Sequence, residues 1–246
     1  MKQNIYDNPI FFKGYKQLRE TGSNLNNILE QPALKAALPD LQHKRILDLG
    51  SGMGHFAMYC IRKGALKVTG VEISKNMISY AKLNNRHEKI EYILSPIEDQ
   101  EFLSESFDLI VSSLTLHYIK NYESIIEKVY KWLINSGLFI FTIEHPVCTA
   151  MNPMDGWIKD EVGNKLYWPI DHYGTEGKRV SRWFVDGVVK YHRKISTLVN
   201  GLLFTGFKIV QMIEPDPTQE ALAQNPNLIS EIRRPPFLII KSEKPL

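Results

Sequence analysis

Between residues 45 and 143, short apolar runs alternate with amphipathic stretches. A short apolar run bounded by turn residues predicts a buried strand, and apolar residues at helical spacing predict a helix. The predicted strands are 45–49, 67–73, 90–94, 107–112 and 138–143, and the predicted helices between them are 54–63, 74–86 and 122–134. Strands that alternate with helices in this way predict a doubly wound α/β fold, in which a mostly parallel sheet carries helices on both faces.

The first 43 residues have a helical pattern and are expected to form an N-terminal extension. Asn8-Pro9 has the form of a helix start. Tyr15 and Arg19 follow on the same predicted helix, four residues apart, so they share one face. A second helix is predicted over residues 25–38.

The alternation of strands and helices stops after residue 143. The next stretch is rich in Pro, Gly, Trp and Tyr and has no helical period. Loops of this length usually either carry a function or are disordered, and the density of aromatic residues argues against disorder. A helix at 194–204, a strand at 206–213, a proline-rich loop at 214–236 and a last strand at 237–241 are predicted to complete the chain.

Residues 179–193 have the pattern of a β-hairpin. Asp186-Gly187 is a favoured two-residue turn between arms rich in β-formers. That turn predicts Trp183, Lys190 and His192 on one face. The segment 146–193 begins where the fifth strand ends, so we expect it to form a lid over the active site. A dimerisation arm, and hence a homodimer, is the alternative.

The whole-chain composition narrows the class of protein. The 246 residues suit one domain, and a net charge of +3 without a dense basic run argues against a nucleic-acid partner. Cys60 and Cys148 have no metal-ligand spacing, so neither a disulfide framework nor a metal site is expected. The N-terminus lacks the apolar core of a signal peptide, and no run reaches membrane-spanning length. A cytoplasmic protein without a membrane partner is expected.

The stretch 45–54, RILDLGSGMG, carries the strongest chemical signal. Its apolar strand runs into Gly50, Gly52 and Gly54 and then into a helix. Glycine is required where φ is positive or where a ligand approaches the main chain, and the N-terminus of the helix adds free N–H groups. This strand-turn-helix arrangement is typical of a nucleotide site. The dinucleotide fingerprint G-x-G-x-x-G differs, because the third glycine comes one residue early and His55 follows it.

Five loops are predicted at the carboxyl ends of the first five strands, the edge where open α/β sheets bind ligands. Together they resemble the ordered motifs of the class I S-adenosylmethionine (SAM) methyltransferases over about residues 41–145. The later strings EHP, HYGTEGKR, KYHR and RRPPFLI are similar to a bacterial subgroup of small-molecule methyltransferases. The resemblance implies one methyltransferase domain over 1–246, with strand order 3-2-1-4-5-7-6 and an antiparallel seventh strand. It also implies SAM as cofactor and S-adenosylhomocysteine (SAH) as product.

The resemblance carries a set of cofactor-binding positions onto this chain. Glu72, after the second strand, is expected to accept hydrogen bonds from the ribose hydroxyls. Relatives often have an Asp near Pro96, so here the adenine is left to the backbone near Ile97. Asp48 either orders the glycine loop or reaches the methionine amine, and Arg19 suits the methionine carboxylate. The expected positions are Tyr15, Arg19, Asp48, Gly50, Ser51, Gly52, Gly54, Glu72, Ile73, Met77, Pro96, Ile97, Glu98, Ser112 and Ser113.

Methyl transfer is an in-line displacement, in which the enzyme mainly aligns the reactants and excludes water. A general base is needed only if the nucleophile must lose a proton. The candidates are His117, His145, His172 and His192, although a packing or hydrogen-bonding role competes with catalysis for each. The resemblance to the bacterial subgroup implies a small-molecule acceptor. An RNA or DNA acceptor is disfavoured, since the charge is near neutral and SSLT follows the fourth strand in place of an N-P-P-Y-like tetrad. A protein acceptor, a non-catalytic SAM-binding regulator and an NAD(P)-dependent oxidoreductase are the alternatives.

Overall fold

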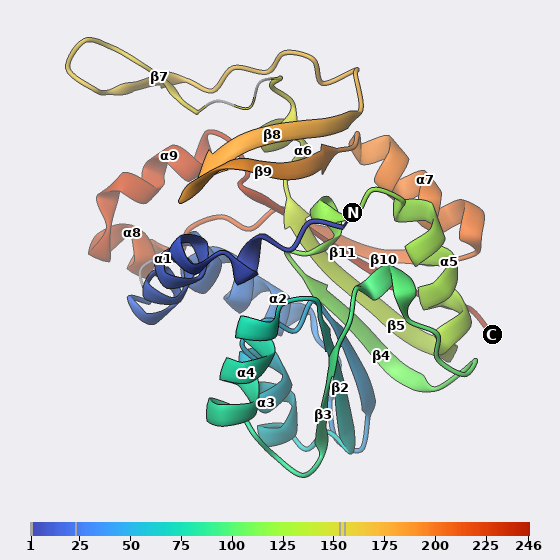
Figure 1. The fold of residues 1–246 in the computed structure, drawn as a ribbon. Helices are drawn as coiled ribbons and strands as arrows, with labels where there is room; N and C mark the ends of the chain where they lie inside the picture. Colours follow the sequence, from blue (N-terminus) through green and yellow to red (C-terminus); the bar gives the residue numbers. More distant parts are fainter. Residues whose placement is uncertain (1, 23, 153, 155) are drawn as a thin grey trace.

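A computed structural model describes residues 2–22, 24–152, 154 and 156–246. Its centre is a seven-stranded sheet of order β10-β11-β5-β4-β1-β2-β3, shown in Figure 1. Counted within the sheet, this is the predicted order 3-2-1-4-5-7-6, which is confirmed. The strands are β1 (Arg45–Leu49), β2 (Lys67–Glu72), β3 (Ile90–Leu94), β4 (Phe107–Ser113), β5 (Leu133–Glu144), β10 (Lys208–Ile213) and β11 (Phe237–Glu243).

Strands β1 to β5 run parallel to one another, and β11 pairs antiparallel with both β5 and β10. Successive side chains of a strand point to opposite faces, so a sheet covered on both sides needs continuous apolar strands. In β1, Ile46 packs in the core under α3, whereas Leu47 packs in the core under α5. This is why the strands read as unbroken apolar runs in the sequence.

Helices cover both faces of the sheet, as predicted. In Figure 1, α3 (His55–Arg62) and α4 (Lys75–Asn84) lie on one face, and α5 (Tyr122–Trp132) and α7 (Ile195–Thr205) lie on the other. The Ser74 side chain accepts a hydrogen bond from the Met77 N–H and caps α4, as its position in the sequence predicts. None of the helices in the described ranges is long and apolar enough to span a membrane.

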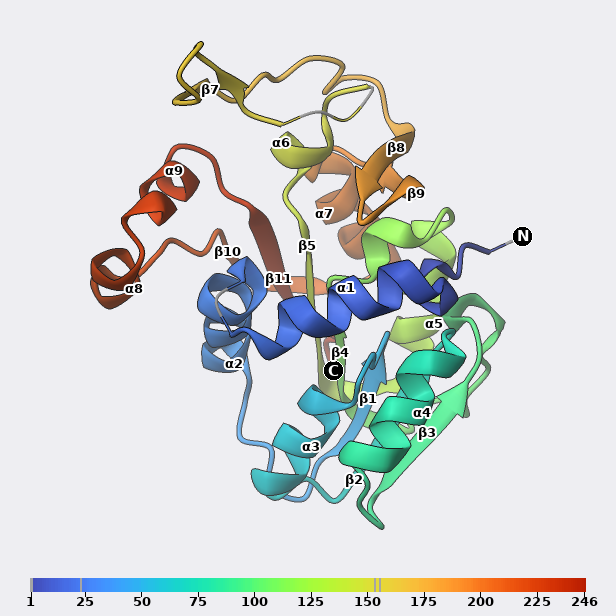
Figure 2. The same cartoon turned by 60° about the vertical axis from the view of Figure 1, so that its left-hand side comes forward.

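The N-terminal extension crosses the upper edge of the sheet. Figure 2 shows α1 (Pro9–Glu20) lying between the sheet and the layer above it. The Asn8 side chain accepts from the Ile10 and Phe11 N–H groups, so the predicted Asn8-Pro9 helix start is confirmed. The rest of the extension comprises the short helices η1 (Ile5–Asp7) and η2 (Asn26–Glu30) and the helix α2 (Gln31–Ala37).

The layer above the sheet comes from residues after β5 (Figure 1). It contains two small antiparallel pairs and shields the carboxyl ends of the parallel strands. Its elements are α6 (Pro146–Thr149), β6 (Ile158–Lys159), β7 (Lys165–Tyr167), β8 (Gly177–Trp183) and β9 (Val185–His192). Short helices also follow β3 and β4, namely η3 (Ile97–Asp99) and η4 (Leu116–Tyr118).

The hairpin turn differs from its prediction. Trp183 pairs with Val185, and Phe184 forms the turn with φ +57°, while Asp186 and Gly187 belong to β9. The rings of Trp183 and Phe184 pack edge-on against Phe11, with ring centroids 5.2 and 5.5 Å away. Burying two large aromatic rings against α1 outweighs a local turn preference worth about 1 kcal/mol.

Two other boundaries differ from the predictions. The helix before β5 ends at Trp132, and the strand already begins at Leu133, because Leu133 pairs with Phe107 and the Ser136 N–H donates to the Lys244 carbonyl. The predicted loop at 214–236 contains α8 (Gln219–Gln224), η5 (Pro226–Leu228) and α9 (Ile229–Ile232). Thr218 caps α8 through the Ala221 N–H, a start signal that the surrounding prolines obscured.

Candidate active site

A large cavity lies between the carboxyl ends of the parallel strands and the layer above them, with a volume of about 1890 Å³. We call its lining residues numbered 2–113 the cofactor half and those numbered 114–237 the acceptor half. The cofactor half includes the loops after β1, β2 and β3 and the end of β4, and the acceptor half includes the loop after β4, η4, the end of β5 and the hairpin β8–β9. This is the ligand edge expected of an open α/β sheet.

The loop after β1 needs glycine at three positions, for different reasons. Gly50, Gly52 and Gly54 all have positive φ, at +82°, +52° and +80°. A Cβ on Gly50 would lie 2.0 Å from Thr115 Oγ1, and one on Gly54 would lie 2.2 Å from the Tyr92 hydroxyl oxygen. A Cβ on Gly52 would meet no atom within 4 Å, and Gly52 lines the cavity. Gly50 and Gly54 therefore allow the loop to pack closely against Thr115 and Tyr92. Gly52 instead leaves open the part of the cavity next to the loop.

Glu72 lies at the end of β2, across the loop from Gly52. Its carboxylate accepts hydrogen bonds from the Gly52 N–H at 3.0 Å and from the Ser74 N–H at 2.9 Å. Burial raises the pKa of Glu72, although these N–H donors act in the opposite direction. A buried carboxylate with one face fixed by the main chain can present its remaining acceptor capacity to ribose hydroxyls.

Four polar side-chain atoms of the cofactor half are buried without a hydrogen-bond partner in the described part of the chain. They are Asn4 Oδ1 and, around the glycine loop, Arg19 Nη1, Asp48 Oδ2 and Ser51 Oγ. Burial, and then the charge of Glu72, raise the pKa of Asp48 to about 8. Unpaired buried polar groups cost free energy unless a ligand satisfies them. One cationic donor, one acidic acceptor and one hydroxyl fit the carboxylate and ammonium groups of an amino acid, so these residues fit the methionine end of SAM.

Most of the other expected cofactor positions line the same cavity. Tyr15 and Arg19 both face it, as their spacing on α1 predicts. Gly54 and Ser112 do not line it: Gly54 begins α3, and the Ser112 hydroxyl donates to the Leu49 carbonyl. The remaining expected positions that line the cavity are Ile73, Met77, Pro96, Ile97, Glu98 and Ser113.

A buried ion pair lies in the acceptor half. Lys190 Nζ, on β9, lies 2.5 Å from Glu144 Oε1 at the end of β5 and 5.6 Å from the centre of the Trp183 ring. Burial would raise the pKa of Glu144 and lower that of Lys190, but their mutual attraction reverses both directions. The lysine and the tryptophan both line the cavity, although the turn from which their shared face was predicted lies elsewhere and His192, predicted with them, does not line it.

His117 is the candidate histidine that lines the cavity. Its ring is 4% exposed, and its Nδ1 accepts from the Glu144 N–H at 3.4 Å. Burial lowers the pKa of His117 to about 4, despite the opposing effect of the nearby Glu144 carboxylate. The ring is therefore neutral at physiological pH. With Nδ1 as the acceptor, its proton resides on Nε2, and the ring can donate a hydrogen bond.

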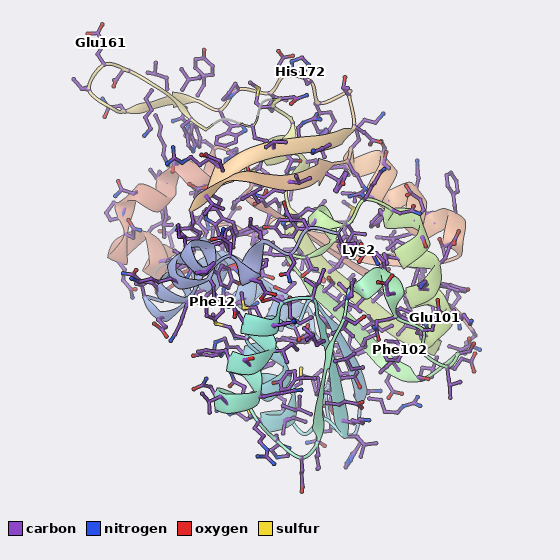
Figure 3. All side chains as sticks on the ribbon, in the orientation of Figure 1. Lys2, Phe12, Glu101, Phe102, Glu161 and His172 are labelled. Carbon is purple, nitrogen blue, oxygen red and sulfur yellow. The ribbon has the colours of Figure 1, made fainter. Side chains whose placement is uncertain are left out.

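The other three candidate histidines do not line the cavity. His145 accepts from the Val147 N–H to cap α6 and contacts Glu214 through Nε2 at 2.8 Å. His192 is fully buried between the Thr149 hydroxyl and the Tyr173 carbonyl. Figure 3 shows His172 at the outer edge of the upper layer, where half of its side chain is exposed. Three of the four candidate histidines therefore form hydrogen bonds within the protein or lie away from the cavity.

The N-terminal segment joins the two halves of the cavity. Asp7 accepts from the Ser74 hydroxyl at 2.6 Å and from the Asn76 N–H at 3.0 Å, at the start of α4. Burial alone would raise the pKa of Asp7, but these donors hold it below its ordinary value. At the other side, the Gln3 amide donates to the Val189 carbonyl and accepts from the Val189 N–H, at 3.1 and 2.7 Å. The segment therefore bridges the cofactor loops and the hairpin.

Several residues around the site carry no clear signal in the sequence. Glu30 is fully buried and accepts from the Ser113 and Thr142 hydroxyls, which ties η2 to the ends of β4 and β5. Arg234 lines the cavity from the loop before β11. The sequence shows Glu30 and Arg234 only as charged residues near apolar ones. That pattern does not identify the groups they contact.

The fold and the ligand edge of the sheet together define a doubly wound α/β protein of the nucleotide-binding type. A methyltransferase domain model matches residues 47–141. The crystal structure of a protein from Listeria monocytogenes, described as a candidate SAM-dependent methyltransferase, is 40% identical in sequence to this chain. The match covers 94% of this chain and 100% of that one, with a TM-score of 0.84. A SAM-dependent methyltransferase structure from Mesorhizobium loti is 37% identical over 87% of this chain and 97% of that one, with a TM-score of 0.81.

The similarity continues beyond the cofactor loops. An uncharacterised protein of Haemophilus influenzae is 35% identical over 253 residues, which is 99% of this chain and 98% of that protein. The chain therefore belongs to the SAM-dependent methyltransferase family, as its motifs predicted, and SAM is the cofactor of that family. A phosphoethanolamine N-methyltransferase of Plasmodium falciparum is 33% identical over 45% of this chain and 44% of its own length.

Proposed function

We propose that this enzyme transfers a methyl group from SAM to a small-molecule acceptor enclosed under residues 146–193. The observation that carries the proposal is the cavity that runs from the glycine loop to the hairpin β8–β9. Its volume of about 1890 Å³ exceeds the roughly 300–1,000 Å³ of a pocket for one drug-sized ligand. The cavity has room for the cofactor and a second small molecule.

The cofactor half has the groups needed to hold SAM. In the proposal, Arg19 binds the methionine carboxylate, while Asp48 and Ser51 bind the ammonium group. Glu72 accepts from the ribose hydroxyls, and the backbone around Ile97 takes the adenine. When bound, SAM supplies a methyl group on a positively charged sulfur, and the protein's task is to align that methyl group with the acceptor.

Aromatic side chains between the two halves exclude water from the site. Tyr6 packs edge-on against Tyr15 and Tyr118, with ring centroids 5.1 and 6.4 Å away, and Tyr15 packs edge-on against Trp183 at 6.0 Å. All four line the cavity. A wall of packed rings restricts water at the reacting centre and fixes the approach of the acceptor.

We assign His117 the role of a hydrogen-bond donor that orients the acceptor. A base with a pKa of about 4 is poorly matched to proton removal at neutral pH, because catalytic bases work best with a pKa near the operating pH. Its neutral ring instead offers an N–H group beside Glu144. Methyl transfer needs no base when the nucleophile arrives without a proton to lose.

The proposal is tested first by titration and labelling. SAM and SAH should bind in calorimetry with one site each, and NADH should not bind. Methyl-labelled SAM incubated with the enzyme and a metabolite extract should then yield a labelled small molecule. SAM binding without transfer to any fraction would favour a non-catalytic regulator and contradict the proposal.

The lid is tested by replacing residues 177–192 with a short Gly/Ser linker. We expect SAM affinity to remain within a few-fold and acceptor turnover to be lost. Gln3→Ala is the control, because it removes the contact of the N-terminal segment with Val189 while the hairpin stays in place. Light scattering on the same variant addresses the alternative: loss of a dimer with unchanged turnover would make this segment a dimerisation arm.

A further inference from the structure

The two halves of the cavity differ in charge. The described residues lining the cofactor half include three carboxylates and two cations. Those lining the acceptor half include one carboxylate, Glu144, and five cations, which are Lys120, Lys178, Arg182, Lys190 and Arg234. SAM has a sulfonium and an ammonium group against one carboxylate, so its net positive charge suits a half with more carboxyl groups than cations, where Asp48 can lose its proton when the ammonium group binds. The basic half attracts the opposite charge, because a cleft lined by one sign of charge concentrates ligands of the other.

Arg234 is the best-positioned cation of the acceptor half. Its guanidinium carbon lies 4.2 Å from the centre of the Trp168 ring, and its Nη1 donates to Cys148 Sγ at 2.8 Å. Nη2 lies 3.1 Å from Glu231, a residue that does not line the cavity. Within the described residues, the third guanidinium nitrogen, Nε, is buried and has no partner. A guanidinium packed over an aromatic ring, with an unpaired N–H and in a residue that lines the cavity, is suited to a planar oxyanion.

Lys190 supplies a second buried cation. Its side chain is 7% exposed, and Glu144 occupies one of the three directions in which an ammonium group can donate. Arg182 and Lys178 are exposed and line the same cavity. The acceptor half therefore combines two largely enclosed cations, Lys190 and Arg234, with exposed ones.

We propose that the acceptor is an anionic small molecule, whose carboxylate or phosphate group is bound by Arg234 and Lys190. This inference rests on the proposed methyl transfer and specifies the substrate class for the same site. The anion anchors the acceptor at the lid side of the cavity, and a different atom of the acceptor receives the methyl group. Trp168 and Trp183 form apolar walls beside the two cations, so an organic anion with an apolar body fits better than a bare ion.

The first experiment separates this inference from the proposed function. A metabolite extract is passed over an anion exchanger, and each fraction is incubated with the enzyme and methyl-labelled SAM. We expect the labelled product from the retained fraction. Labelling only from the unretained fraction would overturn the anionic acceptor and leave methyl transfer intact. Labelling from no fraction, with SAM still bound, would overturn the proposed function itself.

The second experiment measures binding directly, with matched aromatic probes. Calorimetry on the SAH-saturated enzyme compares benzoate and phenyl phosphate with benzamide and benzylamine. We expect at least one anionic probe to bind on the order of tenfold or more tightly than benzamide, since a charge-assisted hydrogen bond is roughly twice as strong as a neutral one. The tighter of the two anions identifies the carboxylate or the phosphate as the recognised group. Equal or tighter binding of benzylamine would overturn the inference.

Variants then test the two cations. Arg234→Met should weaken the anionic probe by on the order of tenfold to a hundredfold, the effect of losing a charged hydrogen bond, with SAH affinity unchanged. Arg233→Met is the matched control, because Arg233 donates to the Lys165 and Leu166 carbonyls and does not line the cavity. If both variants weaken the probe equally, Arg234 acts through lid packing and the inference fails. Lys190→Met combined with Glu144→Gln avoids an unpaired buried charge and should also weaken anion binding while SAH binding persists.

Discussion

The cofactor half and the acceptor half of the cavity differ in the origin of their residues. Gly52 follows β1, Glu72 ends the adjacent parallel strand β2, and the Gly52 N–H donates a hydrogen bond to the Glu72 carboxylate. The acceptor half instead brings together η4, the hairpin β8–β9 and the loop before β11, which are widely separated along the chain. The cofactor half can be detected from local sequence motifs, because its residues lie in the loops at the ends of successive strands. The acceptor half cannot, because long-range packing brings its residues together. Five variants test how independent the two halves are.

The largest expected effect is the loss of SAM binding in Gly52→Val. The new side chain would occupy the open space in front of the loop and would also be strained at a φ of +52°. Gly163→Val is a matched control, because Gly163 also has a positive φ and no atom within 4 Å of a built Cβ, but lies in the β6–β7 turn. Calorimetry should find no SAM binding in the first variant and ordinary binding in the second. Equal SAM binding by both variants would show that the cofactor site does not lie at the loop around Gly52.

Arg179→Met should damage the lid and spare the cofactor half. Arg179 is 2% exposed, and its guanidinium donates to the carbonyls of Thr149, Ala150, His172, Thr175 and Lys178. Removing the guanidinium leaves several buried carbonyls unpaired. Each carbonyl that water cannot reach should lower the free energy of unfolding by about 1–3 kcal/mol.

We expect a lower Tm, faster hydrogen exchange over residues 146–193 and SAM affinity within about twofold of the parent. Arg182→Met on the same strand should change stability by less than about 0.5 kcal/mol, because its side chain is 81% exposed. A SAM site that weakens together with the lid would show that the two halves form one cooperative unit.

Glu72→Ala should weaken SAM binding by about 2–3 kcal/mol, or roughly thirtyfold to 150-fold, because it removes charged acceptors from the ribose. Glu72 also accepts from the Gly52 and Ser74 N–H groups, so part of the loss comes from the loop itself. Glu72→Gln retains one acceptor and should lose less. Calorimetry with SAM and with adenosine separates the contributions: a loss for SAM without a loss for adenosine would place Glu72 away from the ribose.

Asp48→Asn should change how the stability of the ligand-free protein depends on pH. Burial raises the pKa of Asp48 to about 8, so the folded protein binds a proton that the unfolded chain releases near pH 4. The free energy of unfolding should therefore fall as pH rises through this window, by at most about 1.4 kcal/mol per pH unit from this group. Over about 1.5 pH units above pH 5.5, the effect is at most about 2 kcal/mol.

Urea titrations across that range should show a smaller decline for Asp48→Asn than for the parent, and Asn should weaken SAM binding at the same time. A matching slope in the two proteins would contradict the buried, protonated Asp48. Comparing Asp48→Asn with the parent tests whether the buried Asp48 carboxyl group lowers the stability of the ligand-free protein while strengthening the binding of a cationic ligand.

The smallest expected effect, about 1 kcal/mol, belongs to Gln3→Ala, which removes two hydrogen bonds to Val189. In the parent, SAM binding should slow hydrogen exchange in the hairpin, because the N-terminal segment contacts both halves. That protection should decrease in Gln3→Ala, and Gln3→Glu should restore it in part, since its carboxylate can still accept from the Val189 N–H. Undiminished protection in Gln3→Ala would show that another contact couples the halves.

Local patterns in the amino-acid sequence are sufficient to predict the sheet and its ligand edge. Apolar runs such as 45–49 must be buried on both faces, and glycines such as Gly52 mark backbone conformations that other residues rarely adopt. Because these constraints act within a few residues, the order of elements, the glycine loop and the position of Glu72 follow from the sequence. The strand order itself came from the family resemblance, because periodicity does not encode which strands are neighbours.

The hairpin turn and the acceptor half depend instead on tertiary packing. Phe184 rather than Asp186-Gly187 forms the turn, because aromatic packing on Phe11 is a long-range contact that no local propensity encodes. Only the folded structure shows that His145 and His192 are used in hydrogen bonds within the protein, and that Arg234 keeps a donor unpaired among the described residues. A side chain's chemistry depends on which partners surround it, and partners distant in sequence become neighbours only when the chain has folded.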